Sequence, residues 1–147
     1  MTIKELSIGN YLRVTREGLC IKKGTIIKIN EINAENKFTK KGLVGAIYCH
    51  PLDEDQLDGG IWFAYLEPIE ITPAILEKSG WKVNRGTNIW FAILGENVVI
   101  THSSNMKDDE TFIVVIADGG EIRFKFRYVH QLQNILTLCG IDKEIEL

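Results

Sequence analysis

The residues best suited to nucleophilic chemistry are Cys49 and His50, which are neighbours in the sequence. An imidazole beside a thiol can lower the pKa of the thiol and produce a reactive thiolate. Neighbouring residues on a strand point to opposite faces of the sheet, however, so these two side chains do not meet readily. We interpret Cys49 as a packing residue at a strand end and His50 as a loop residue. No HExxH, GxSxG or P-loop pattern is present. We therefore expect no catalytic residue and a protein that is not an enzyme.

Alternating acids between residues 53 and 59 are the best candidates for binding a hard cation through oxygen ligands. The segment reads Asp-Glu-Asp-Gln-Leu-Asp-Gly, with acids at positions 53, 54, 55 and 58. A calcium loop of the EF-hand type needs glycine at its sixth position and glutamate at its twelfth. Here Asp58 and Ala64 take those positions. We interpret the segment as a solvated loop and expect neither a metal site nor a cofactor.

Basic residues gather in the first third of the chain. Residues 1–50 hold nine Lys or Arg against four acids, whereas residues 51–147 hold eight against sixteen. This asymmetry indicates either an anionic partner for the basic half or two halves that attract each other. Five lysines in predicted loops form a candidate anion or nucleic-acid patch: Lys22, Lys23, Lys37, Lys40 and Lys41. The alternative for this patch is an ordinary solubilising surface.

Six aromatic residues invite interpretation as a stacking platform: Trp62, Phe63, Tyr65, Trp81, Trp90 and Phe91. Aromatic side chains can stack on the bases of a single strand. Trp62 and Phe63 are adjacent, so one of them faces the core and the other faces outward. We favour packing in the hydrophobic core for most of these rings.

Short segments rich in β-branched residues, separated by glycine turns, dominate residues 1–70. Strands are expected over residues 11–14, 25–32, 43–49 and 61–66, with a polar loop over 33–42 and an acidic loop over 50–60. Several short strands joined by small loops predict an SH3-like β-barrel over residues 1–70.

Residues 71–147 follow a different pattern. Thr72 followed by Pro73 predicts a helix that continues to Ser79 and ends at Gly80. Strands are then expected over residues 88–94, 97–102, 111–117 and 121–126, followed by a helix over 128–139. The predicted fold class is α+β, mainly β: the small barrel, followed by a helix, a four-strand antiparallel meander and a helix.

The last predicted helix carries no Asp, Glu, Lys or Arg from Tyr128 to Ile141. At 100° per residue its apolar residues share one half of the helical wheel: Val129, Leu132, Ile135, Leu136, Leu138 and Cys139. The candidate protein-contact face is uncharged: His130, Gln131, Gln133, Asn134 and Thr137. Amide groups can bind a partner without the cost of desolvating ions. This face is expected to pack either against the barrel or against another chain.

Three sequence segments resemble those of a known family. They are Leu6-Ser7-Ile8-Gly9-Asn10-Tyr11-Leu12, the run from Leu66 to Trp81 that contains LEPIEIT and LEKSGW, and Tyr128-Val129-His130-Gln131-Leu132-Gln133-Asn134. In this order they resemble a family of short, uncharacterised proteins encoded in prophages and mobile elements of gut-type bacteria. The resemblance implies a cytoplasmic, mobile-element-associated protein and supplies no activity. The chain departs from the family pattern at residues 16–24 and 103–110.

Composition limits the function classes. The 147 residues are 45% hydrophobic and 25% charged, with a net charge of -3, which is typical of a globular protein and not of a strongly basic nucleic-acid binder. No apolar run approaches the roughly 20 residues that span a bilayer, and the three cysteines show no disulfide pattern. We expect a cytoplasmic protein that contacts no membrane.

The leading hypothesis is a non-enzymatic binding or adaptor protein of phage or mobile-element origin. Its partner would be an unidentified protein or a second copy of itself, held on the face of the last helix. The alternative is a nucleic-acid-binding accessory protein that uses the lysine loops. A small-molecule enzyme comes third, because it would need a deep pocket with converging polar groups.

Overall fold

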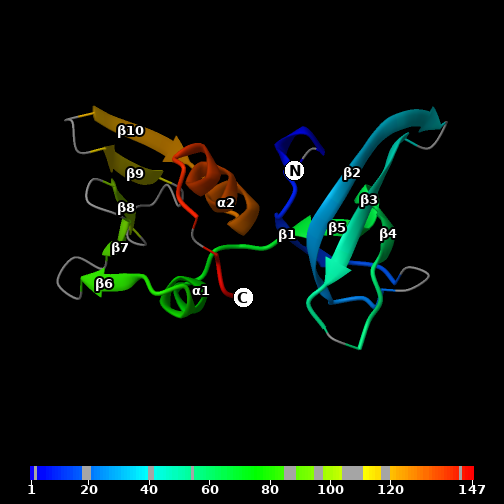
Figure 1. Ribbon diagram of the computed structural model, residues 1–147, viewed down its shortest axis with the longest axis horizontal. Coiled ribbons are helices and arrows are strands. Elements are labelled where there is room, and N and C mark those ends of the chain that lie inside the picture. The colour runs from blue at the N-terminus through cyan, green and yellow to red at the C-terminus, as the bar shows by residue number, and fades with distance from the viewer. Residues whose placement is uncertain are drawn as a thin grey trace. The chain divides into compact units, whose positions relative to one another are not determined.

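The computed structural model describes residues 1, 3–17, 21–39, 42–53, 55–84, 89–94, 98–103, 111–116, 120–142 and 144–147. Of these, residues 3, 33–46 and 83–125 are described by their backbone alone. The chain forms two compact units, Met1–Ile69 and Glu70–Leu147. Each unit contains a five-stranded antiparallel sheet (Figure 1), and the fold is α+β, mainly β. No helix among the described residues is long and apolar enough to span a membrane.

The first unit contains a short 3-10 helix, four successive strands, a second 3-10 helix and a fifth strand. The elements are η1 (Ile3–Glu5), β1 (Tyr11–Val14), β2 (Ile26–Thr39), β3 (Gly42–Pro51), β4 (Gly59–Trp62), η2 (Phe63–Tyr65) and β5 (Leu66–Pro68). The sheet order is β4-β3-β2-β1-β5, so the last strand returns to pair with the first.

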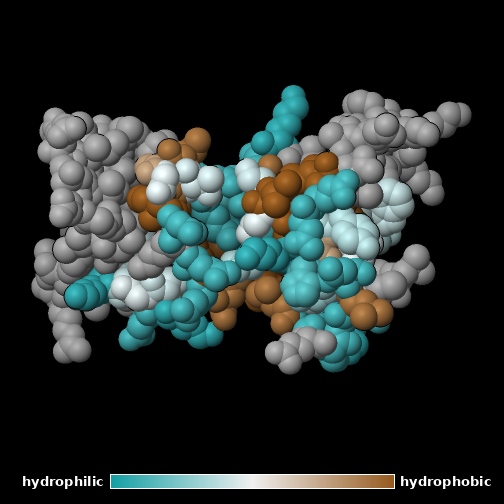
Figure 2. Space-filling view, in the orientation of Figure 1, coloured by the Kyte–Doolittle hydropathy of each residue, from teal (hydrophilic) through white to brown (hydrophobic). Residues whose placement is uncertain are grey.

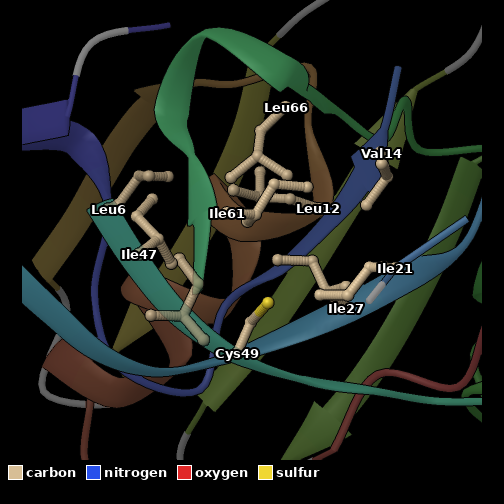
Figure 3. Packing of buried hydrophobic residues seen from close by; sticks show 10 residues of the cluster. Leu6, Leu12, Val14, Ile21, Ile27, Ile47, Cys49, Ile61 and Leu66 are labelled. Atoms are coloured by element: carbon tan, nitrogen blue, oxygen red, sulfur yellow. The ribbon is translucent and has the colours of Figure 1, made fainter. Parts of the chain in front are cut away.

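Alternation along these strands separates a core face from an outer face. Ile27 and Ile29 on β2 lie on the core face together with Ile47 and Cys49 on β3, and all four are fully buried. Ile61 of β4 pairs with Ile47 and joins the same cluster (Figure 3). The residues between them, such as Tyr48 and His50, therefore belong to the outer face.

Four features of the first unit differ from the sequence-based expectations. His50, expected in the acidic loop, belongs to β3, which extends to Pro51. Residues 33–39 belong to β2, because the polar segment pairs with β3 up to Thr39 opposite Gly42. The strand expected over residues 61–66 divides into the end of β4, the 3-10 helix η2 and the start of β5. The sheet is not closed, because β4 and β5 are its end strands.

The second unit is a meander between two helices. Its elements are α1 (Pro73–Lys78), β6 (Lys82–Asn84), β7 (Ile89–Leu94), β8 (Val98–Ser103), β9 (Thr111–Ile116), β10 (Gly120–Lys125) and α2 (Val129–Leu138). The sheet order β10-β9-β8-β7-β6 follows the chain. Strand β6 was not expected, because three residues are too few to show an alternating pattern.

Helix α1 begins and ends where the sequence predicts. The side-chain oxygen of Thr72 accepts a hydrogen bond from the Ile75 amide at 3.3 Å, and Pro73 occupies the first helical position. Gly80 follows the helix with φ +75°, a left-handed conformation that glycine adopts without strain. The C-terminal segment is bonded to this helix, because the Glu146 amide donates to Ser79 Oγ at 3.0 Å and Ile145 is buried.

Candidate binding surface

Two large aromatic side chains lie exposed on the outer face of the first unit's sheet. Tyr48 of β3 and Trp62 of β4 each expose 49% of their surface. Tyr48 pairs with Gly60, and Trp62 pairs with Ala46, so the two aromatic residues are diagonal neighbours across the strand pair. In Figure 2 part of the surface over β3 and β4 is pale, which marks intermediate hydropathy, and hydrophilic residues lie beside it. We call Tyr48, Gly60 and Trp62 the aromatic face.

Gly60, which lies opposite Tyr48 and two residues before Trp62, leaves open space beside the two rings. A Cβ atom built at this position would meet no heavy atom within 4 Å. Diagonal neighbours on a sheet lie close enough for aromatic side chains to reach one another or a shared ligand. The aromatic face therefore offers two half-exposed rings beside an open glycine.

A contact between two polar side chains lies beside the aromatic face. His50, two residues after Tyr48, contacts Asp58 through Nδ1 and Oδ1, and both side chains are about half exposed. Lys28 pairs with His50 across the sheet, and its Nζ lies 5.6 Å from the centre of the Tyr11 ring. Glu31 is exposed and pairs with Tyr48. Acidic and basic groups thus lie on the same face of the sheet near Tyr48.

Cys49 faces the other way and is not available as a nucleophile. Its side chain lies in the apolar cluster (Figure 3), and Sγ donates to the Gly59 carbonyl oxygen at 3.3 Å. Burial, together with the negative charge of Asp58, raises the pKa of the thiol from 9.0 to about 11. The thiolate is therefore scarce at neutral pH, and Cys49 and His50 lie on opposite faces of β3.

The five candidate lysines do not lie in one kind of element. Lys22 and Lys23 are exposed in a turn before β2, whereas Lys37 lies within β2 and not in a loop. Lys40 and Lys41 lie outside the described residues. The expectation that Lys37 lies in a loop is wrong, because β2 extends to Thr39.

The acidic loop after β3 turns back towards the lysine turn. Nζ of Lys22 lies 3.2 Å from Oδ2 of Asp55, and the Lys22 amide donates to Oε1 of Gln56 at 2.9 Å. Gln56 also hydrogen-bonds the hydroxyl of Thr25 at 2.9 Å. Part of the positive charge of the turn is thus neutralised within the unit. The first unit as a whole holds nine basic and nine acidic residues.

Helix α2 places its polar residues in several environments. His130 is fully buried and its ring stacks on that of Tyr128, with the ring centres 5.9 Å apart. Oε1 of Gln131 accepts hydrogen bonds from the amides of Arg127 and Tyr128 at 2.9 and 3.2 Å. Gln131 therefore caps its own helix, and His130 does not contribute to an exposed face.

The rest of the candidate helix face is partly exposed. Gln133 and Asn134 are half-buried, and Thr137 is exposed with its hydroxyl bonded to the Gln133 carbonyl oxygen at 3.0 Å. Leu138, which the helical wheel places on the apolar side, is 81% exposed. Ile135 and Leu136 of the same turn are buried, and Leu138 differs from them because it lies at the edge of the apolar half of the helical wheel.

Sequence reasoning overlooked Tyr48 and assigned Trp62 to a set expected mainly in the core. Of that set, Trp81 is buried, and Phe63 and Tyr65 pack against the first core. Trp90 and Phe91 lie on β7, where only the backbone is described. The alternation on β3 and β4 indicates which residues point outward. Only the strand register shows that Tyr48 and Trp62 are neighbours.

Comparison with known proteins found no matching family model, curated protein or solved structure.

Proposed function

We propose that this chain is a non-enzymatic binding protein whose aromatic face holds an extended segment of another protein. The observation that carries the proposal is the pair of half-exposed rings of Tyr48 and Trp62 beside Gly60. Tyr and Trp are the residues that most often dominate the binding energy of protein interfaces. The resemblance stated above favours a protein of phage or mobile-element origin that acts in the cytoplasm.

The surroundings of the aromatic face favour a polypeptide over a polyanion. Lys28 and Glu31 carry opposite charges on the same face, and His50 is paired with Asp58. Such mixed charge gives no strong attraction to a phosphate backbone, whereas it suits the polar rim of a protein interface.

We also propose that the first unit is an SH3-like variant of a small barrel. Four successive strands, a 3-10 helix before the fifth strand and the pairing of β5 with β1 support this assignment. Small barrels of this type serve many unrelated functions, so the function is argued from the aromatic face and not from the fold.

Selection of peptides from a displayed random library tests the proposal directly. The wild-type chain is expected to enrich peptides that bind with micromolar affinity. Trp62→Ala should weaken that binding by more than about thirtyfold, which corresponds to the roughly 2 kcal/mol expected of a hot-spot residue. Tyr48→Ala should weaken it by about tenfold. Titration calorimetry measures both changes.

Leu138→Ala provides the matched control, because it removes another exposed apolar side chain from the second unit. This variant should bind the selected peptides as the wild type does. If no peptide is enriched, or if the enriched peptides bind the Trp62 and Tyr48 variants unchanged, the proposed surface is wrong.

Nucleic-acid binding is the second candidate function. Two exposed aromatic rings can stack on bases, and Lys23 and Lys28 lie in the same unit. This function predicts binding of a fluorescent single-stranded oligonucleotide that weakens steeply between about 50 and 200 mM salt. The neutral balance of the first unit argues against it. Absence of binding at about 50 mM salt would exclude it.

A further inference from the structure

Each of the two sheets has two end strands, and among these four strands β4 differs from the others because it has no charged residue and no proline. An open strand edge invites pairing with another chain, and proteins protect such edges with charged residues or proline. Strand β5 contains Glu67 and Pro68, β6 contains Lys82, and β10 contains several charges. Strand β4 reads Gly-Gly-Ile-Trp and contains neither a charge nor a proline. Among the described residues, β3 is the only strand that pairs with β4.

We propose that β4 of one copy pairs antiparallel with β4 of a second copy, with a two-fold axis at Ile61. The inference uses the same aromatic face as the proposed function but does not require the peptide partner. Here the face contacts a second copy of the chain, and the tests below distinguish this pairing from peptide binding.

The alternation of β4 allows this register and excludes a shift by one residue, and the fit of Trp62 over Gly60 then selects it. Ile61 points into the core and is 3% exposed, whereas Gly60 and Trp62 belong to the outer face. In a continuous sheet, directly opposed residues share a face. A two-fold axis at Ile61 meets this condition, because it sets Ile61 opposite Ile61 of the second copy and Gly60 opposite Trp62 of the second copy. A shift of one residue would set Gly60 opposite Ile61 and place outer residues against core residues.

This register places the ring of Trp62 from one copy over the open position at Gly60 of the other. The position above Gly60 is open, since a Cβ there would meet nothing within 4 Å. The indole of Trp62 from the second copy would lie over Gly60 and beside Tyr48, which pairs with Gly60 in its own chain. Packing of an aromatic ring over a glycine on the neighbouring strand is a known stabilising arrangement in sheets. The two-fold axis repeats the contact, so the paired strands carry both tryptophans and both tyrosines on one face.

Charge and size set the strength of the association. Because β4 carries no charge, the two-fold axis brings no like charges into opposition. A four-residue strand and two rings form an interface below the roughly 1,200 Å² of a standard stable complex. The expected dimer is therefore weak, with a Kd on the order of 100 µM, and it forms in a concentration-dependent way.

Gly60→Val tests the pairing with little risk to the fold. The backbone at Gly60 does not require a positive φ, and an added Cβ atom has open space within one chain. Valine also favours strand structure, so the free energy of unfolding should stay constant or rise. The added side chain would occupy the space that receives Trp62 of the second copy. Sedimentation equilibrium from about 10 µM to 1 mM should show a rising mass for the wild type and a monomer for the variant.

Leu57→Ala is the control for this experiment, because it removes an exposed apolar side chain of the same unit outside β4. It should self-associate like the wild type. A wild type that stays monomeric up to about 1 mM, or a Gly60→Val variant that associates equally well, would overturn the proposed pairing. Either result leaves the peptide-selection experiment untouched, so failure of one idea can be told from failure of the other.

A mixing experiment tests the register itself. Gly60→Trp places two tryptophans on β4, and Trp62→Gly leaves none. In a homodimer of either variant, tryptophan lies opposite tryptophan or glycine lies opposite glycine. In the mixed dimer, a tryptophan lies opposite a glycine at both positions. Native mass spectrometry, which separates the two chains by mass, should show a larger share of the mixed dimer than random pairing gives. A statistical 1:2:1 distribution, or no mixed dimer, would contradict the register.

Discussion

The thiol of Cys49 shows how one buried group links local structure to the pH dependence of stability. Its folded-state pKa lies near 11 because burial and the carboxylate of Asp58 disfavour the thiolate, whereas an unfolded thiol titrates near 9.0. Below pH 9 both states keep the proton. Between pH 9 and 11 the unfolded state loses it first, so the free energy of unfolding falls as the pH rises. The shift corresponds to at most about 3 kcal/mol.

We predict that replacing Cys49 by alanine removes this contribution to the fall in the free energy of unfolding at alkaline pH. Urea unfolding at pH 8 and at pH 10.5 should give a smaller decrease for Cys49→Ala than for the wild type. Cys139→Ala is the matched control, since Cys139 is only partly buried. It should retain the decrease of the wild type. Equal decreases in the wild type and in Cys49→Ala would contradict the assigned role of Cys49.

At the scale of an element, Gln131 is a cap of helix α2 and not only part of a polar strip. Its Oε1 accepts from the amides of Arg127 and Tyr128, which would otherwise have no partner within the helix. We predict that Gln131→Ala lowers the free energy of unfolding by about 1 kcal/mol. Gln131→Glu keeps the acceptor and adds a negative charge near the helix N-terminus, which should preserve stability. Thermal unfolding followed by circular dichroism measures both, and a neutral Gln131→Ala would contradict the capping role.

The sequence predicts elements better than it predicts their surfaces. Thr72 and Pro73 specify the start of α1 because a cap and a proline act locally, and the alternation of Ile27 and Ile29 specifies the core face of β2. The extension of β2 through residues 33–39 depends on pairing with β3, which no local pattern records. The aromatic face likewise depends on register, since Tyr48 and Trp62 are fourteen positions apart and become neighbours only across β3 and β4.

The division of the whole molecule into two units changes how its charge is understood. Counted over residues 1–50, the chain begins with a basic segment, whereas the unit Met1–Ile69 holds equal numbers of acids and bases. Four of the five further acids lie in the acidic loop, which belongs to the first unit and reaches Lys22 through Asp55, and the fifth is Glu67. The second unit carries the whole net charge of -3, with eight basic and eleven acidic residues. A sheet-forming unit without net charge has less long-range repulsion between its copies.

Each unit also has buried residues of its own, which leads to a prediction for the whole chain. Ile145 is 1% exposed and lies beside Glu146, whose amide is bonded to Ser79. We predict that Ile145→Ala destabilises the second unit by about 2–5 kcal/mol, because a buried isoleucine is replaced by a cavity. Glu146→Ala is the control, since the bond to Ser79 uses only its backbone.

Hydrogen exchange followed by mass spectrometry locates the effect of Ile145→Ala. Amides of helix α2 should exchange faster, whereas those of β1 and β2 should keep their protection, because local and subglobal openings report the stability of separate cooperative units. The apolar cluster around Leu12 and Ile27 consists of residues of the first unit alone. Loss of protection in β1 and β2 to the same extent as in α2 would show instead that the two units open together, and the chain would then have to be treated as one cooperative body.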